Sequence, residues 1–248
     1  VFAVERLGAA LAVQRVRYAE VTVTPQFYAR DAAAMQRWLD VLNEGRRRVR
    51  RDRGIELRWI PDIVRSVPRF AEAVAAWACS DRARDGGVVA LGLGGPEPDG
   101  PAASFADVFR WARERGLPAN PHAGEGTGAA GVRAALEHLA PARIGHGVGA
   151  AEDPDLMSRL ADRGMPLEVC ITSNLRLGLY ADARSHPVRT LVDAGCIVTL
   201  NTDDPALFGT TLDGEFELAA ACGLTQRQLA QCARNAVRAA YDFSLGTA

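Results

Sequence analysis

The stretch Ala119-Asn120-Pro121-His122-Ala123-Gly124-Glu125 is a short extended segment that ends in an imidazole, a glycine and a carboxylate. A helical pattern follows at about 129–139, and a second short segment at 143–146 ends at His146. A strand, a helix and a further strand in this order form the repeating unit of a parallel βα sheet. This stretch therefore predicts parallel strands connected by helices.

The same alternation extends along the chain in both directions. Strands are predicted at 17–24, 55–63, 88–94, 119–123, 143–146, 167–172 and 197–201, and helices at about 31–51, 67–81, 104–115, 129–139, 154–163, 187–193 and 225–241. The strand starts are about 30 residues apart, which is the period of a (β/α)₈ barrel. A doubly wound sheet also alternates strands and helices, but its glycine-rich phosphate turn does not follow the first predicted strand. The pattern favours an α/β fold of the TIM (β/α)₈ type.

Seven predicted strands are one fewer than a closed barrel needs. The chain begins with Val1 rather than Met, and helix-like sequence at 4–16 leads into the first predicted strand. We therefore expect that the absent strand is the first one and that the chain is an N-terminally truncated version of a longer protein. The 248 residues, of which 48% are hydrophobic, are enough for one barrel domain spanning 1–248.

Composition excludes several classes of function. The formal net charge of −1 provides no field that would attract nucleic acid or an acidic membrane, and the arginines at 46–53 are interpreted as the solvated end of a helix. No apolar segment approaches the ~18 residues that span a bilayer, and no secretory signal pattern opens the chain. The five widely spaced cysteines favour buried, reduced thiols. We expect a cytoplasmic protein that binds neither nucleic acid nor membranes.

Polar side chains follow three of the predicted strands. They occur in Pro121-His122-Ala123-Gly124-Glu125, Arg143-Ile144-Gly145-His146-Gly147 and Leu200-Asn201-Thr202-Asp203-Asp204-Pro205. In a (β/α)₈ barrel the carboxyl ends of the strands meet at one mouth, where the active site forms. We expect these imidazole and carboxylate groups to converge there, although they are far apart in the sequence.

The residue types at these strand ends suit zinc chemistry. Zinc accepts imidazole nitrogen and carboxylate oxygen, and a catalytic zinc lowers the pKa of water to ~7. His122 and Asp203 suit the ligand role, and Glu125 is close enough to His122 to act as a general acid on the same substrate. Consecutive strand residues face opposite sides, so Asp203 and Asp204 are expected to have different roles. The pattern predicts a zinc hydrolase.

Five segments resemble the adenosine deaminase family, the zinc-dependent purine deaminases of the amidohydrolase superfamily. They are Gly92-Leu93-Gly94-Gly95-Pro96-Glu97, the three strand-end segments quoted above, and Leu167-Glu168-Val169-Cys170-Ile171-Thr172-Ser173-Asn174. The segments occur in the family's order across nearly the whole chain. The resemblance implies hydrolytic deamination of a 6-aminopurine nucleoside, adenosine or deoxyadenosine, to the 6-oxo product and ammonia.

The resemblance also implies roles for individual residues. His122 and Asp203 would bind zinc, Glu125 would protonate purine N1, and His146 would orient the attacking water and stabilise the developing oxyanion. Asp203 would also contact the attacking hydroxide, and the purine itself would be bound by Asp204 at N7 and the backbone of Gly95 at N3. One Zn²⁺ per full-length chain is expected. Its two further ligands, a His-x-His pair, are expected upstream of Val1, because no two of the four histidines here are two positions apart.

Two alternatives remain open. Within the same chemistry, the substrate is adenine or aminodeoxyfutalosine, since the residues that contact the purine ring do not identify the sugar side. In another class, the protein is a non-catalytic purine-binding barrel that has lost its metal site. The absent His-x-His pair favours the binding protein, whereas the joint presence of Glu125, His146, Asp203 and Asp204 favours the enzyme. In either case the expected partner is a small purine molecule.

Overall fold

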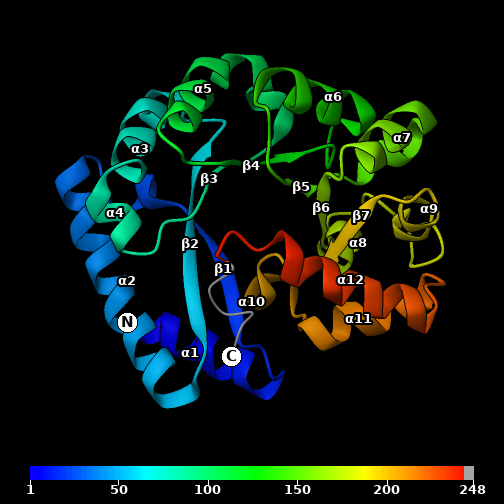
Figure 1. Ribbon diagram of the computed structural model, residues 1–248, viewed down its shortest axis with the longest axis horizontal. Coiled ribbons are helices and arrows are strands. Elements are labelled where there is room, and N and C mark those ends of the chain that lie inside the picture. Colours follow the sequence, from blue (N-terminus) through cyan, green and yellow to red (C-terminus); the bar gives the residue numbers. More distant parts are fainter. Residues whose placement is uncertain (243–248) are drawn as a thin grey trace.

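Seven parallel strands form one curled sheet in the computed structural model, which describes residues 1–242. They are β1 (Tyr18–Val23), β2 (Glu56–Val64), β3 (Leu91–Gly94), β4 (Ala119–Ala123), β5 (Ile144–His146), β6 (Pro166–Val169) and β7 (Ile197–Leu200). Each strand pairs with the next in sequence order, and the sheet curls into an incomplete barrel (Figure 1). The predicted barrel architecture is confirmed. Strands β1 and β7 are the two edges of the sheet, and they pair neither with each other nor with a further described strand. The domain predicted for 1–248 includes residues 243–248, which lie outside the described part.

Helices connect the strands. They are α1 (Phe2–Val13), α2 (Ala32–Arg53), α3 (Ala71–Ala78), α4 (Asp81–Asp85), α5 (Ala106–Glu114), α6 (Gly128–His138), α7 (Pro154–Asp162), α8 (Ile171–Arg176), α9 (Val188–Asp193), α10 (Pro205–Phe208), α11 (Leu212–Ala221) and α12 (Gln226–Ala239). Short 3₁₀ turns lie at Pro25–Phe27, Pro68–Phe70, Glu97–Asp99, Ala102–Phe105 and Val148–Glu152. Helices α2, α3, α5, α6 and α7 cover the outer face of the sheet (Figure 1).

The hydrophobic core lies between the sheet and these outer helices. Trp59 and Ile63 of β2 are almost fully buried there, and so are Leu93 of β3 and Ile144 of β5. The indole nitrogen of Trp59 donates a hydrogen bond of 2.9 Å to Asn43 Oδ1 of α2, so the one polar atom of this large side chain is satisfied. The outward-facing strand residues therefore attach the helices, and the inward-facing residues are free to form the barrel interior.

Several helices begin at residues whose side chains accept backbone hydrogen bonds. Asp31 accepts from Ala34 N at the start of α2, and Asp153 accepts from Leu156 N at the start of α7. Thr225 begins α12 with a reciprocal capping box. These caps fix the residue at which each helix begins.

The structure differs from the sequence prediction around β6 and in the last third of the chain. The strand predicted at 167–172 ends at Val169, and helix α8 begins at Ile171. Buried Glu215 of α11 accepts the backbone N–H groups of Ile171 (2.9 Å) and Thr172 (3.2 Å), which turns this segment into a helix. Helix α11 itself was not predicted, because Gly214 interrupts its first turn and its apolar pattern is weak.

A network of buried polar groups fills the barrel at the amino ends of the strands. Arg143, just before β5, contacts Glu20 of β1 (2.5 Å) and Glu168 of β6 (2.9 Å). Its guanidinium also stacks on the ring of Tyr241, 3.8 Å from the centroid, and Asn120 of β4 accepts a hydrogen bond of 3.1 Å from it. We call these five residues the Arg143 network.

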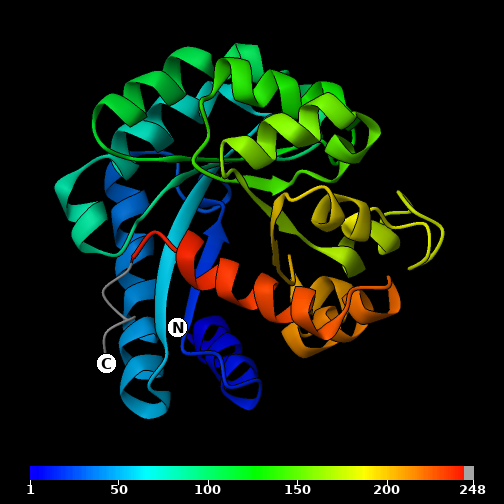
Figure 2. The same ribbon diagram turned by 45° about the vertical axis from the view of Figure 1, so that its right-hand side comes forward.

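The chain after α12 crosses the open side of the barrel toward β1 and β2 (Figure 2). The backbone N–H of Tyr241 donates to Glu20 Oε1 at 2.7 Å, and its hydroxyl donates to Asn120 Oδ1 at 2.9 Å. Asp242 accepts from Arg58 of β2 at 2.6 Å. The last described residues therefore close this end of the barrel.

Within residues 1–242, every helix is too short or too polar to cross a membrane. The five cysteines are free thiols, and four of them are buried, as the sequence predicts.

Candidate active site

His122, Glu125 and His146 meet at the carboxyl ends of β4 and β5. These strands are neighbours, with Ala123 paired to His146. The two imidazole rings meet edge to face with centroids 5.0 Å apart, and Glu125 Oε1 lies 3.6 Å from His146 Nδ1. One ligand atom from each of the three side chains lies within 4.8 Å of the others. This spacing is close enough for a metal ion to be held between them.

Asp203 approaches the same imidazole from the end of β7. Its Oδ2 lies 3.7 Å from His146 Nε2. A second group with ligand atoms within 4.8 Å of one another therefore consists of His146, Cys170 and Asp203. His146 belongs to both groups, whereas His122 and Asp203, the two predicted zinc ligands, are not in the same group. We call His122, Glu125, His146 and Asp203 the strand-end cluster.

Two members of this cluster have backbone conformations that side chains other than glycine rarely adopt. His146 has φ +60° and Asp203 has φ +54°. A left-handed residue turns the chain sharply, here at the last residue of β5 and three residues beyond the end of β7. Such conformations cost about 1 kcal/mol or more and are concentrated at functional sites. Of the four described non-glycine residues with positive φ, two therefore belong to the strand-end cluster.

Burial favours the uncharged forms of Glu125 and His146. It raises the pKa of Glu125, with the charges of Asp203 and Glu97 adding to this effect and that of His122 opposing it. Burial also holds the pKa of His146 well below its usual value, and repulsion from His122 acts in the same direction. Glu125 Oε1 is buried and lacks a hydrogen-bond partner among the described residues. The result is a carboxyl group that is able to donate a proton and a neutral imidazole beside it.

His146 is held by residues that the sequence analysis did not single out. Its Nδ1 lies 3.3 Å from Asn174 Nδ2, and Asn174 Oδ1 lies 3.2 Å from His186 Nε2. His186 Nδ1 in turn accepts the backbone N–H of Val188 at the start of α9. This chain of contacts assigns the His146 proton to Nε2, the nitrogen that faces Asp203. The one available sequence signal was the position of Asn174 at the end of the segment 167–174.

Asp204 and Gly95, predicted to contact the purine, lie outside the two metal-capable groups. Asp204 caps α10 by accepting from Ala206 N (3.2 Å) and Leu207 N (3.1 Å), whereas the carboxylate of Asp203 lies beside His146. The reason is a turn rather than strand alternation, since β7 ends at Leu200. Gly95 follows β3 with φ +85° and is exposed, which leaves its backbone accessible.

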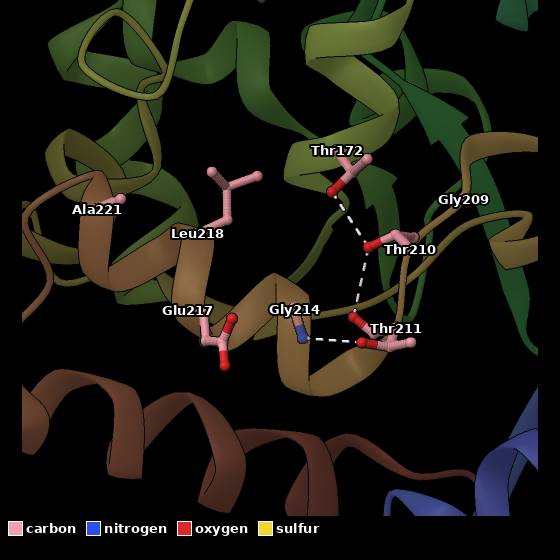
Figure 3. A pocket seen from close by; sticks show the side chains of 8 residues that line it. All are labelled: Thr172, Gly209, Thr210, Thr211, Gly214, Glu217, Leu218 and Ala221. Carbon is pink, nitrogen blue, oxygen red and sulfur yellow. Dashed lines mark hydrogen bonds between the residues drawn. The ribbon is translucent and has the colours of Figure 1, made fainter.

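A surface depression of about 410 Å³ lies along α11 and is lined in part by Thr172, Thr210, Thr211 and Glu217 (Figure 3). Thr172 and Thr210 join their hydroxyl groups across it at 3.2 Å. None of the predicted site residues lines this depression. The candidate site is therefore defined by the convergence of side chains at the strand ends.

A curled parallel sheet with imidazoles and carboxylates at its carboxyl edge is typical of barrel hydrolases of the amidohydrolase superfamily. The model of one family, described as adenosine deaminase, matches residues 4–243. The chain belongs to the adenosine deaminase family, which is a family of enzymes.

Similar proteins agree with this assignment. An aminodeoxyfutalosine deaminase from Streptomyces avermitilis is 41% identical over 240 residues, covering 96% of this chain and 67% of that protein. An adenine deaminase from Mesorhizobium japonicum is 40% identical over 226 residues, covering 90% of this chain and 69% of that protein. The solved structure of a zinc-bound amidohydrolase from Burkholderia ambifaria has a TM-score of 0.88 at 30% identity, covering 96% of this chain and 67% of that one. The chain spans 62% to 70% of the length of such curated relatives.

Proposed function

We propose that the protein catalyses hydrolytic deamination of a 6-aminopurine. The observation that carries this proposal is the strand-end cluster, in which a carboxyl group with a raised pKa lies 3.6 Å from a neutral imidazole. Removal of an aromatic amine requires a proton on the ring and a water directed at the adjacent carbon, and these groups supply both. Relatives at 40% and 41% identity are named as deaminases, which supports the same reaction.

Adenine or aminodeoxyfutalosine is the substrate that we propose. The sequence motifs favour adenosine or deoxyadenosine, with adenine and aminodeoxyfutalosine as the alternatives. The names of the relatives support the alternatives, because one is an aminodeoxyfutalosine deaminase and the other an adenine deaminase. A small purine is thus the proposed partner, and the buried free cysteines support a cytoplasmic location.

Each residue of the cluster has a distinct task in this proposal. Glu125 donates its proton to purine N1, which makes C6 electron-poor. His146, whose Nε2 carries the proton, orients the water that attacks C6 and then stabilises the developing oxyanion. Asp203 accepts a hydrogen bond and then a proton from the same water. As the C6–N bond breaks, this proton leaves with the amino group as ammonia, and the proton of the new C6 hydroxyl group returns to Glu125. The backbone of Gly95 and the carboxylate of Asp204 hold the purine at N3 and N7.

The donor set fits a zinc ion. Ligand atoms of His122, Glu125 and His146, and of His146, Cys170 and Asp203, lie within 4.8 Å of one another in each group, and zinc prefers such nitrogen, oxygen and sulfur ligands. We propose that His122 and Asp203 hold the ion together with a His-x-His pair outside residues 1–248. When bound, zinc supplies a Lewis acid that lowers the pKa of water to ~7. The zinc-bound neighbour at 30% identity supports this proposal.

The test uses protein expressed from its complete reading frame and reconstituted with zinc. Ammonia release and the ultraviolet change at C6 are followed with adenine, adenosine and aminodeoxyfutalosine. We expect turnover of adenine or aminodeoxyfutalosine, and the Glu125→Gln variant should lose at least about a hundredfold in kcat. If the protein binds purine but neither releases ammonia nor binds stoichiometric zinc, it is instead the non-catalytic binding barrel. Turnover of adenosine alone would contradict the proposed substrate.

A further inference from the structure

Glu97 is a buried carboxylate that receives four hydrogen bonds from one turn. It lies after β3 in the 3₁₀ turn Glu97–Asp99 and is 8% exposed. Its Oε1 accepts the backbone N–H groups of Glu125 (2.8 Å) and Gly126 (3.0 Å). Its Oε2 accepts the N–H of Gly124 (3.0 Å) and the hydroxyl of Thr127. Three successive backbone amides of the 124–127 turn thus depend on one side chain from another loop.

The protein leaves room for this carboxylate at one helix position. A Cβ atom added to Gly131, in the first turn of α6, would overlap Glu97 Oε2 and Thr127 Oγ1. The turn is also packed tightly on its other side, since a Cβ at Gly124 (φ +71°) would overlap Val132. Without Glu97, the buried N–H of Gly124 and its neighbours would lose their acceptors. The contact is therefore a built part of the loop after β4.

Arg65 binds a backbone carbonyl group of the same segment. Arg65 is 2% exposed, and its guanidinium donates to the carbonyl oxygens of His122 (2.7 Å) and Gly100 (2.5 Å). The carbonyl that precedes the turn is thus fixed from the end of β2, and the amides of the turn are fixed by Glu97 after β3. Opposite charges on two neighbouring loops hold the segment that carries Glu125.

We propose that Glu97 is a positioning residue. Together with Arg65, it fixes the 124–127 turn so that the carboxyl group of Glu125 faces His146 and the purine. The inference rests on the proposed function, in which Glu125 is the proton donor. Glu97 touches the backbone of the turn and leaves the reacting atoms to Glu125. A displacement of a catalytic group by 1 Å costs about a hundredfold in rate. Holding this turn is therefore a direct requirement for proton transfer.

Hydrogen–deuterium exchange of residues 121–130 tests the hold on the turn and needs no turnover. Glu97→Gln keeps the side-chain shape but replaces one acceptor oxygen with a donor, so exchange at 124–126 should be at least about tenfold faster. Gly131→Ala favours helix α6 while displacing Glu97, and should give the same acceleration if Glu97→Gln folds poorly. The matched control is Glu152→Gln, because exposed Glu152 accepts only the N–H of Ala129 in this region. Unchanged exchange at 124–126 in both test variants would overturn the proposal.

The second readout separates positioning from general stability. In the zinc-loaded enzyme, Glu97→Gln should lower kcat about a hundredfold while KM changes less than about threefold. Thr127→Val, which removes one of the four donors, should lower kcat about tenfold in the same manner, and Glu152→Gln should stay within about twofold of the parent. A fall in melting temperature without a selective loss of kcat would show a purely structural role and overturn the proposal. If the parent protein deaminates no purine, the proposed function fails, and the exchange data still decide whether Glu97 holds the turn.

Discussion

The two ends of the barrel both contain buried ionisable side chains, but they differ in how completely these side chains are paired. At the amino ends of the strands, Arg143 is 5% exposed and lies between the carboxylates of Glu20 and Glu168. At the mouth, Glu125 Oε1 and Asp62 Oδ1 are buried without a hydrogen-bond partner among the described residues. Arg143 and its two carboxylates bind one another at the closed end, whereas these two oxygens at the mouth remain available to a ligand.

The direction of the pKa shifts shows the same contrast. Burial alone would lower the pKa of Arg143, but Glu168, Tyr241 and Glu20 together raise it, so this guanidinium is firmly charged. Burial raises the pKa of Asp62, and a hydrogen bond from Thr24 and the charge of His122 only oppose this effect. The charge of Arg143 is stabilised at the closed end, whereas the charges of Asp62, Glu125 and His146 are disfavoured at the mouth. Stability and chemistry thus occupy different ends of the same barrel.

Removing the central cation of the closed end should have the largest effect. Arg143→Met leaves Glu20 and Glu168 buried without their partner, and we expect a loss of about 3 to 5 kcal/mol in the free energy of unfolding. The measurement is urea unfolding monitored by circular dichroism. Arg133→Met is the control, because its pair with Asp153 is solvent-accessible and should contribute at most about 1 kcal/mol. Equal losses in the two variants would remove the distinction drawn for the closed end.

Acid should destabilise the protein through the histidine contacts behind the mouth. Burial lowers the pKa of His186 to about 4, from an ordinary value of 6.5. His186 therefore binds a proton below about pH 6.5 in the unfolded chain but only below about pH 4 in the folded chain. The free energy of unfolding falls as the pH decreases from about 6.5 to about 4. The expected loss reaches about 3 kcal/mol.

Urea unfolding at pH 7 and pH 5 measures this dependence. His186→Asn can still accept the N–H of Val188 and contact Asn174, but it does not titrate. This variant should lose a large part of the difference in stability between the two pH values. An unchanged difference would show that other groups, and not His186, cause the acid sensitivity.

Two matched substitutions of glutamate should have small effects of opposite sign. Glu168→Gln weakens a bonded carboxylate at the closed end, where Asn120 also donates to it at 2.9 Å, and should destabilise the chain by about 2 kcal/mol. Glu125→Gln removes a desolvated acid at the mouth and should stabilise the zinc-free chain by about 1 kcal/mol while abolishing deamination. Thermal and urea unfolding of the pair provide the comparison, and destabilisation by Glu125→Gln would show that the mouth is not strained.

Much of the fold follows from the sequence because each βα unit has its own local signals. The alternation of short apolar segments with amphipathic helices located all seven strands, and β4 has the predicted bounds 119–123. The errors occur where distant contacts override local preference. Residues 170–172 continue the apolar pattern of β6, but Glu215, more than forty residues later, binds their amides and forms α8.

The candidate site was predictable in its residue types and less so in its geometry. Imidazole and carboxylate groups at strand ends indicated His122, Glu125, His146 and Asp203. The left-handed backbone of His146 and Asp203 and the pKa directions of Glu125 and His146 depend on packing and burial that a sequence does not display. Arg143 illustrates the limit, because it lies three residues before His146 in one quoted segment, yet the short strand β5 places the two at opposite ends of the barrel.

The open side of the barrel has a consequence for handling the protein. The edge of β7 is partly blocked, since Asn235 of α12 donates to the carbonyl of Val198 at 3.0 Å. The edge of β1 (Tyr18–Val23) has no strand beside it among residues 1–242, and its sequence is rich in β-branched side chains. Such an edge is a template for intermolecular strand addition, which leads to aggregation. The isolated chain should therefore remain monodisperse at low protein concentration, or when another polypeptide occupies this edge.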